Sequence, residues 1–231
     1  MVVDARLHTD RQYDAELKEL HLKILEMGGF VEKQIAAAVT ALVDRDDSLA
    51  RITIARDHTA NRMDVEIDEL CLRLLALHQP AARDLRLITT ALKITTDLER
   101  IGDMAVNLSE RALELNQEPQ LKPFIDIPRM ADVAQTMLRE SLDAFVREDV
   151  ELALKVCRDD DVIDGLTDQL FRELLSYMIE DPTTVTRAIR LLFVAKYLER
   201  IADHATNIAE MVVFMVKGKS IRHLDQVPPS V

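Results

Sequence analysis

Apolar residues recur at intervals of three and four along most of this chain. The clearest stripe lies between positions 24 and 42 and consists of Ile24, Met27, Val31, Ile35, Ala38 and Leu42. This spacing places side chains on one face of an α-helix. It predicts a helix from about Tyr13 to Val43, in which Gly28-Gly29 marks a kink or a close contact with another helix.

The same spacing continues between the prolines, which mark the joints. It predicts further helices at about 48–78, 81–116, 129–147, 150–180 and 182–217, with a proline-rich linker at 117–128. Short joints make consecutive helices antiparallel neighbours. The pattern therefore predicts an all-α fold of six long helices.

One segment of the chain is repeated. Residues 97–110 read DLERIGDMAVNLSE and residues 197–210 read YLERIADHATNIAE, so that 8 of 14 positions are identical. Chance would give about one identity, so a duplication is the simpler explanation. We expect two tandem three-helix units, at 1–118 and 129–217, joined by a linker at 119–128 and followed by a flexible tail at 218–231.

Composition agrees with long helices and narrows the function. The chain has only 5 glycines and 7 prolines among 231 residues, too few for the many turns of a sheet protein. With 29 basic and 41 acidic residues its net charge is −12, which argues against binding nucleic acid. Excess acid suits cations, basic partner surfaces or simple solubility.

The chain also lacks the features of an exported or membrane protein. The start MVVDARLHTD has no apolar segment, and the longest apolar run, Leu191 to Ala195, is too short to span a bilayer. Cys71 and Cys157 form no CxxC motif and are expected to be buried thiols of a reducing compartment. These features predict a cytoplasmic protein.

The repeat preserves two acids in each copy. Glu99 and Asp103 recur as Glu199 and Asp203, and residues four apart share one helix face. In an antiparallel hairpin, residues equally far from the turn lie at the same level. Counting residues from each turn therefore places further polar residues of the preceding helix opposite these acids. The groups so formed are Asp57, Asn61, Glu99 and Asp103 in the first hairpin, and Asp160, Asp164, Glu199 and Asp203 in the second.

Carboxylates gathered in this way need positive charge nearby. Oxygen ligands suit hard ions such as Mg²⁺, Ca²⁺, Mn²⁺ or iron. The alternative is that these are solvated acidic helix faces, balanced by neighbouring arginines such as Arg100 and Arg200. His204 is rotated by about 100° around the helix axis from Asp203. We therefore expect it to lie at the surface or to contact a partner rather than to bind a metal.

The sequence carries none of the common catalytic motifs. It has no Glu-x-x-His, HExxH, GxSxG, P-loop or GxGxxG, and no obvious pairing of nucleophile and base. Binding or regulation is therefore favoured over catalysis. Two alternatives stay open: a metal-dependent hydrolase or metal-storage bundle that uses the same carboxylates, and a purely structural dimerisation module.

Three segments of the chain resemble signatures of the PhoU family, regulators of bacterial phosphate transport. They are QPAARDLR at 79–86, DLERIGD at 97–103 and LERIADHATNIAE at 198–210. The resemblance implies two three-helix bundles packed side by side with pseudo-two-fold symmetry. It also implies metal ions, among Mg, Mn, Fe and Zn, on the eight residues grouped above. Asn61 departs from the acid that many relatives carry, so we expect tighter binding at the second group.

The resemblance further implies a function. Members repress the phosphate-starvation response when phosphate is plentiful, and they limit phosphate uptake. They are thought to act as adaptors between the ATPase of the phosphate ABC transporter and a sensor histidine kinase. This chain would then be a non-enzymatic cytoplasmic regulator and a homodimer, held at the inner face of the membrane by its partners without inserting into it.

Overall fold

The computed structural model describes residues 2–221, with side chains from residue 11 onward, and this part of the chain contains helices and no strand. The helices are α1 (Val2–Val43), α2 (Asp47–Ala55), α3 (Asp57–His78), α4 (Ala82–Asn116), α5 (Asp126–Arg147), α6 (Val150–Glu180), the short 3₁₀ helix η1 (Pro182–Thr184) and α7 (Val185–Lys217). The all-α prediction is confirmed. The predicted tail lies outside the described residues from position 222 onward.

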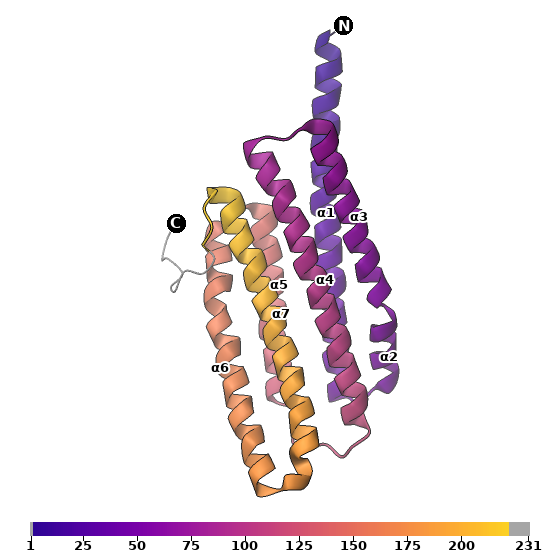
Figure 1. The fold of residues 1–231 in the computed structure, drawn as a ribbon, viewed down its shortest axis with the longest axis vertical. Helices are drawn as coiled ribbons and strands as arrows, with labels where there is room; N and C mark the ends of the chain where they lie inside the picture. The colour runs from indigo at the N-terminus through magenta and orange to yellow at the C-terminus, as the bar shows by residue number, and fades with distance from the viewer. Residues whose placement is uncertain (1, 222–231) are drawn as a thin grey trace.

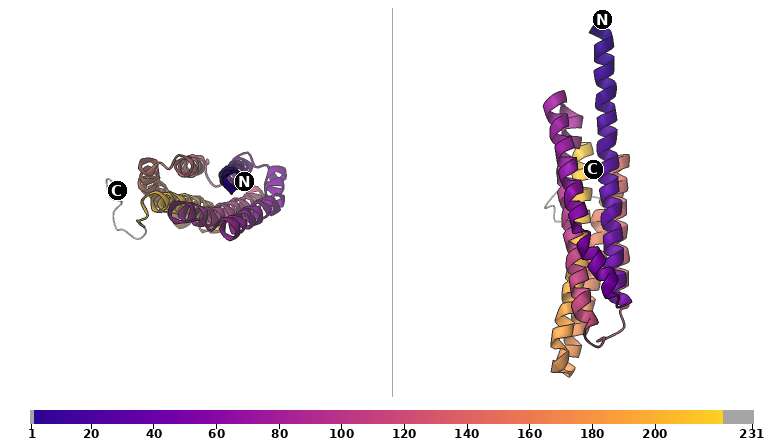
Figure 2. Two further views of the ribbon diagram at one scale, coloured as in Figure 1. Left: turned by 90° about the horizontal axis from the view of Figure 1, so that it is seen from above. Right: turned by 90° about the vertical axis from the view of Figure 1, so that its right-hand side faces the viewer.

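The helices form two bundles whose turns point in opposite directions. The first bundle contains α1 to α4 and the second contains α5 to α7. Figure 1 shows the α3–α4 turn at the top of the molecule and the α6–α7 turn at the bottom. Viewed along the helices, α4 and α7 lie side by side on one long side, and α1 and α5 on the other (Figure 2).

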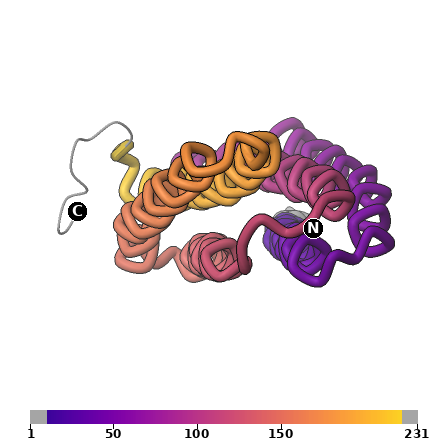
Figure 3. Tube along the Cα trace, turned by 90° about the horizontal axis from the view of Figure 1, so that it is seen from below, coloured from indigo at the N-terminus to yellow at the C-terminus, as the bar shows by residue number. Residues whose placement is uncertain are grey.

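A continuous core joins the two bundles. Buried apolar residues of α1, α4, α5 and α7 belong to one cluster, and Figure 3 shows from below that α4 lies beside α7 and α1 beside α5. A methyl group on Gly28 would overlap the Leu142 side chain, so the glycine allows α1 to approach α5 closely. The close contact predicted at Gly28-Gly29 is therefore confirmed, while α1 itself continues through both glycines.

The predicted helix at 48–78 is wrong in one respect, because it is broken at Arg56. The buried side chain of Gln34 on α1 donates a hydrogen bond of 3.0 Å to the Thr53 carbonyl oxygen. The same carbonyl oxygen accepts a hydrogen bond from the backbone amide of Arg56, three residues later. In an α-helix the donor would be the amide four residues later. The chain restarts at Asp57, which therefore begins α3.

The first helix begins at Val2, earlier than the predicted Tyr13, and the other boundaries are close to those predicted. Asp181 caps the start of η1, where its carboxylate accepts from the Thr183 amide at 2.9 Å. The linker is shorter than predicted, because α5 already begins at Asp126. Lys122 in the linker is buried and pairs with Asp126 at 2.9 Å and with Glu173. None of the helices within residues 2–221 combines the length and the hydropathy needed to cross a bilayer.

Candidate functional site

The two antiparallel hairpins each bring acids of neighbouring helices to one level. We call the group formed by Asp57, Asn61, Glu99 and Asp103, on α3 and α4, the first cluster. The group formed by Asp160, Asp164, Glu199 and Asp203, on α6 and α7, is the second cluster.

The second cluster has the register that the sequence predicts. Burial and the nearby carboxylate of Asp203 raise the pKa of Asp160 to about 6, and Asp164 adds to this shift. Burial and the carboxylate of Glu199 raise the pKa of Asp164 in the same way. The acids of α6 therefore face those of α7 in the pairs Asp160–Asp203 and Asp164–Glu199.

Asp160 is the least compensated member of the second cluster. Its Oδ1 atom is buried and accepts no hydrogen bond of normal geometry from any residue that the structure describes. The hydroxyl group of Thr206 lies close enough to lower the pKa of Asp160. Its oxygen, however, is not in a position to form a hydrogen bond of normal geometry with the Asp160 carboxylate. A buried acceptor without a partner is unfavourable, so this oxygen favours a proton or a cation.

A lysine that the sequence analysis missed lies at the second cluster. Lys196 forms an ion pair with Glu199, three residues later on the same face of α7. The hydrogen bond to Glu199 raises the pKa of Lys196, and Asp203 and Asp164 contribute in the same direction. The spacing of three between Lys196 and Glu199 was the available signal. Lys196 thus supplies one positive charge to four acids.

The first cluster is balanced more completely. The Asn61 side-chain amide donates to Asp57 Oδ2 at 3.0 Å. Arg100 lies 3.4 Å from Glu99 and 3.2 Å from Asp103, so a single guanidinium serves both acids of α4. Each of these four residues therefore already has a polar partner.

Asp64 is a further acid near the first cluster that the sequence analysis missed. Burial and Asp103 raise the pKa of Glu99, and both Asp64 and Asp57 add to this shift. Asp64 lies seven residues after Asp57, about two turns along the same face of α3. Because the corresponding residue in the second hairpin is Thr167, comparison of the two repeats does not reveal it.

The two clusters differ in how well they would suit a metal ion. Between residues 11 and 221, no three His, Cys, Asp or Glu side chains are arranged so that they could hold an ion as they stand. At the second cluster the donors are all carboxylate oxygens, and a buried one is unpartnered, which fits a hard cation after side-chain rotation. At the first cluster the acids already interact with the Asn61 amide and the Arg100 guanidinium, which leaves less need for a cation.

Of the two roles predicted for His204, a surface role or a role in binding a partner, the structure contradicts the surface role. Its Nδ1 atom lies 2.7 Å from Asp97 Oδ1 on α4, and the Asn207 amide donates to the same oxygen at 3.4 Å. Both partners of the His204–Asp97 pair are mostly buried. The contact therefore ties α7 of the second bundle to α4 of the first.

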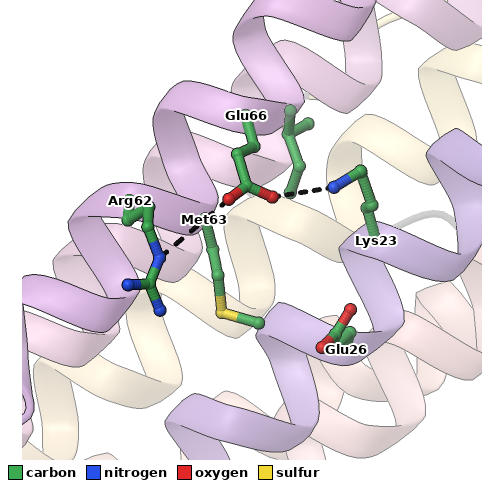
Figure 4. Close-up of a pocket in the computed structure, with 6 residues that line it drawn as sticks. Lys23, Glu26, Arg62, Met63 and Glu66 are labelled. Carbon is green, nitrogen blue, oxygen red and sulfur yellow. Dashed lines mark hydrogen bonds and ion pairs between the residues drawn. The ribbon is translucent and has the colours of Figure 1, made fainter.

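Two other features offer no chemistry of their own. A pocket of about 100 Å³ between α1 and α3 is lined by charged side chains (Figure 4), where Lys23 pairs with Glu66 at 2.8 Å.

Of the two thiols, Cys71 is buried as predicted and Cys157 is only partly covered. Burial raises the pKa of each thiol to about 12, so both stay protonated and unreactive at neutral pH.

Known proteins resemble this chain over most of its length. The family model described as "PhoU domain" matches residues 24–112 and again residues 127–212. A protein of Pseudomonas putida named "Phosphate-specific transport system accessory protein PhoU homolog" is 43% identical over 218 residues, which cover 94% of this chain and 85% of the relative. The Escherichia coli K12 protein "Phosphate-specific transport system accessory protein PhoU" is 37% identical and covers 94% of this chain and 90% of its own length.

Solved structures agree with these relatives. The crystal structure of PhoU from Pseudomonas aeruginosa has a TM-score of 0.86 and 43% sequence identity, covering 90% of this chain and 100% of its own. The phosphate transport system regulatory protein PhoU from Streptococcus pneumoniae has a TM-score of 0.84 at 29% identity, covering 90% of this chain and 99% of its own. The fold of two tandem three-helix bundles is therefore shared with these structures.

Proposed function

This chain belongs to the PhoU family, and from that membership we propose that it represses the phosphate-starvation response and limits phosphate uptake. The observation that carries the proposal is the match over both bundles to relatives named as accessory proteins of phosphate transport. These names also support a regulatory role rather than an enzymatic one.

The mechanism we propose is that of an adaptor. The chain would contact the ATPase of the phosphate ABC transporter and a sensor histidine kinase, and would act at the inner face of the membrane through these partners. Support comes from the long, acidic helix surfaces, which suit binding to basic partner surfaces. A homodimer would present each of these surfaces twice.

We also propose that the second cluster binds a divalent or trivalent cation. Asp160, Asp164, Glu199 and Asp203 would hold it, and the bound ion would supply the positive charge that these acids lack. The unpartnered oxygen of Asp160 and its raised pKa support this assignment. The first cluster would bind an ion more weakly, because Asn61 and Arg100 already satisfy its acids.

Deletion of the gene in its host tests the regulatory function. We expect genes for phosphate scavenging to be expressed at high phosphate in the deletion strain, and expression of this chain to restore repression. Unchanged expression at high phosphate would contradict the proposal. If the purified chain instead hydrolysed phosphoesters with a bound metal ion, the enzymatic alternative would replace it.

A further inference from the structure

Two buried oxygen atoms without a hydrogen-bond partner lie near each other between α6 and α7. They are Oδ1 of Asp160 and Oγ1 of Thr206. The Thr206 hydroxyl is close enough to lower the pKa of Asp160, yet neither atom takes part in a hydrogen bond of normal geometry. Two neighbouring buried polar atoms without partners are unfavourable, and one group bound between them would satisfy both.

The register of the helices places Thr206 at one end of the second cluster. Thr206 follows Asp203 by three residues on α7 and therefore lies on the same side of that helix, about one turn farther from the α6–α7 turn. Asp203 lies close to Asp160, since its carboxylate raises the pKa of Asp160. The hydroxyl group thus borders the Asp160–Asp203 end of the second cluster.

The opposite end of the second cluster, near Lys196, is less suited to a cation. The Lys196 ammonium group pairs with Glu199 and counteracts the rise in the pKa of Asp164 and of Asp203. The pKa of Asp160 is raised chiefly by burial and by neighbouring carboxylates. A cation is repelled by the ammonium group and attracted to the least compensated carboxylate, so the end at Asp160 is the more favourable one.

The first hairpin lacks this hydroxyl group. Residues 97–110 align with residues 197–210 without a gap, and Val106 stands where the second hairpin has Thr206. Valine has nearly the shape of threonine but no polar atom. The hydroxyl is therefore a feature of the second hairpin that the repeated acidic motif does not reveal, and the chain itself suggests valine as the replacement that removes it.

We propose that the Thr206 hydroxyl oxygen is a ligand of a cation bound at the second cluster, together with Asp160 and Asp203. A hydroxyl and two carboxylates form an all-oxygen donor set, which suits a hard ion such as Mg²⁺ or Mn²⁺. Serine and threonine hydroxyls bind Mg²⁺ in phosphate-binding loops for the same reason. The inference rests on the cation binding proposed above and adds a ligand to it.

Cys157 is the competing donor at this level of the hairpin. It lies three residues before Asp160 on α6, just as Thr206 lies three residues after Asp203 on α7. Burial, together with the carboxylates of Glu210 and Asp160, raises the pKa of the Cys157 thiol to about 12. Hard cations bind thiolates weakly, and this thiol stays protonated at neutral pH, so the hydroxyl is the better ligand.

Mn²⁺ binding to the full chain tests this assignment. Calorimetry is done in a Glu99→Ala/Asp103→Ala background, which leaves the second cluster alone. Thr206→Val removes a donor and should lower the affinity at least about tenfold, whereas Thr206→Ser keeps the hydroxyl and should stay within about threefold. Thr167→Val is the matched control, because it removes another buried hydroxyl without a partner, at the Lys196 end, and should leave the affinity unchanged.

A spectroscopic measurement separates direct ligation from an indirect effect on packing. Tb³⁺ is a hard ion that takes oxygen ligands, and its luminescence decay in H₂O and in D₂O reports how many water molecules it binds. A lost ligand leaves a coordination position to water, so Thr206→Val should raise this number by about one and Thr206→Ser should not. Circular dichroism would establish that each variant is folded.

The outcomes distinguish this inference from the proposed cation site. Unchanged affinity in Thr206→Val, or a fall in affinity without an added water molecule, would overturn the inference and leave the site standing. An equal fall in Thr167→Val, or a loss of binding in Cys157→Ala but not in Thr206→Val, would also overturn it. If the background protein bound no Mn²⁺, the second cluster would not be a cation site and the inference would fail with it.

Discussion

The two hairpins carry nearly the same acids at the same spacing, yet they balance the negative charge differently. In the first cluster Arg100 serves Glu99 and Asp103, while Asn61 donates to Asp57. In the second, the Lys196 ammonium pairs with Glu199, and the buried Asp160 Oδ1 has no hydrogen-bond partner in the described chain. The duplication has thus kept the positions of the acids while their electrostatic environments have diverged.

Two substitutions account for much of this difference. Asn61 stands where the second hairpin has Asp164, and Thr96 stands where it has Lys196. The first exchange removes a negative charge and adds a hydrogen-bond donor. The second determines whether an ammonium group is built into the cluster. If these residues set the difference, exchanging them should make the clusters more alike.

Asp164→Asn should have the largest effect on the comparison. It gives the second cluster the amide found in the first, and we expect the affinity for Mn²⁺ to fall about a hundredfold, equivalent to about 2.7 kcal/mol. Isothermal titration calorimetry measures this loss. Asp168→Asn, one turn away on α6, should change the affinity less than about threefold. Retention of wild-type affinity by Asp164→Asn would remove this residue from the proposed ligand set.

Asp160→Asn should stabilise the metal-free protein. The pKa of Asp160 is about 6 in the folded state, against the ordinary value of 3.8 for an aspartate, so the folded state binds the proton more tightly. Ionisation of Asp160 therefore lowers stability as the pH rises from about 4 through 6. At about pH 7.5 the variant should be more stable by about 2 kcal/mol, and this gain should vanish below about pH 4.

Denaturant unfolding in a chelator over this pH range measures the effect. Asp57→Asn is the matched change in the first cluster, where the carboxylate already accepts a hydrogen bond, and it should gain no stability at pH 7.5. A loss of stability in Asp160→Asn at neutral pH would show that the buried carboxylate is compensated in the folded protein.

Asn61→Asp should bring the first cluster closer to the second. The change adds a carboxylate and removes the amide that occupies Asp57. We expect the affinity of the first cluster for Mn²⁺ to rise about tenfold, equivalent to about 1.4 kcal/mol. The measurement is best made in a Glu199→Ala/Asp203→Ala background, which isolates the first cluster. An unchanged affinity would mean that Arg100, rather than Asn61, limits binding there.

Lys196→Gln should have the smallest effect. Removal of the ammonium group frees Glu199, and we expect the affinity of the second cluster for Mn²⁺ to rise about threefold. Arg200→Gln, on the same helix, serves as the charge-matched control and should have less effect. Weaker Mn²⁺ binding by Lys196→Gln would indicate that the lysine organises the cluster instead of competing with the ion.

The long helices and the pairing of acids could be predicted because both depend on local spacing. The bounds of α6 coincide with the predicted 150–180, and the acids of α6 and α7 face each other as hairpin counting indicates. The break at Arg56 could not be predicted, because it depends on a hydrogen bond from Gln34 in another helix.

Two of the residues that were misplaced or missed, His204 and Asp64, show a similar limit. His204 was assigned to the surface from its position on its own helix, but its partner Asp97 belongs to the other bundle. Asp64 was missed because its counterpart is Thr167, so the repeat carried no signal for it. The spacing of apolar residues does not reveal contacts between the two bundles. Comparison of the two repeats does not reveal a residue that only one repeat carries.

The inequality of the two clusters is tested most directly by titrating the metal-free wild-type chain with Mn²⁺ in a calorimeter. We predict a tighter and a weaker class of sites that differ at least about tenfold in affinity. Glu199→Ala/Asp203→Ala should abolish the tighter class and leave the weaker one, and Glu99→Ala/Asp103→Ala should do the reverse. Equal affinities in the wild type, or loss of the tighter class in Glu99→Ala/Asp103→Ala, would contradict the account.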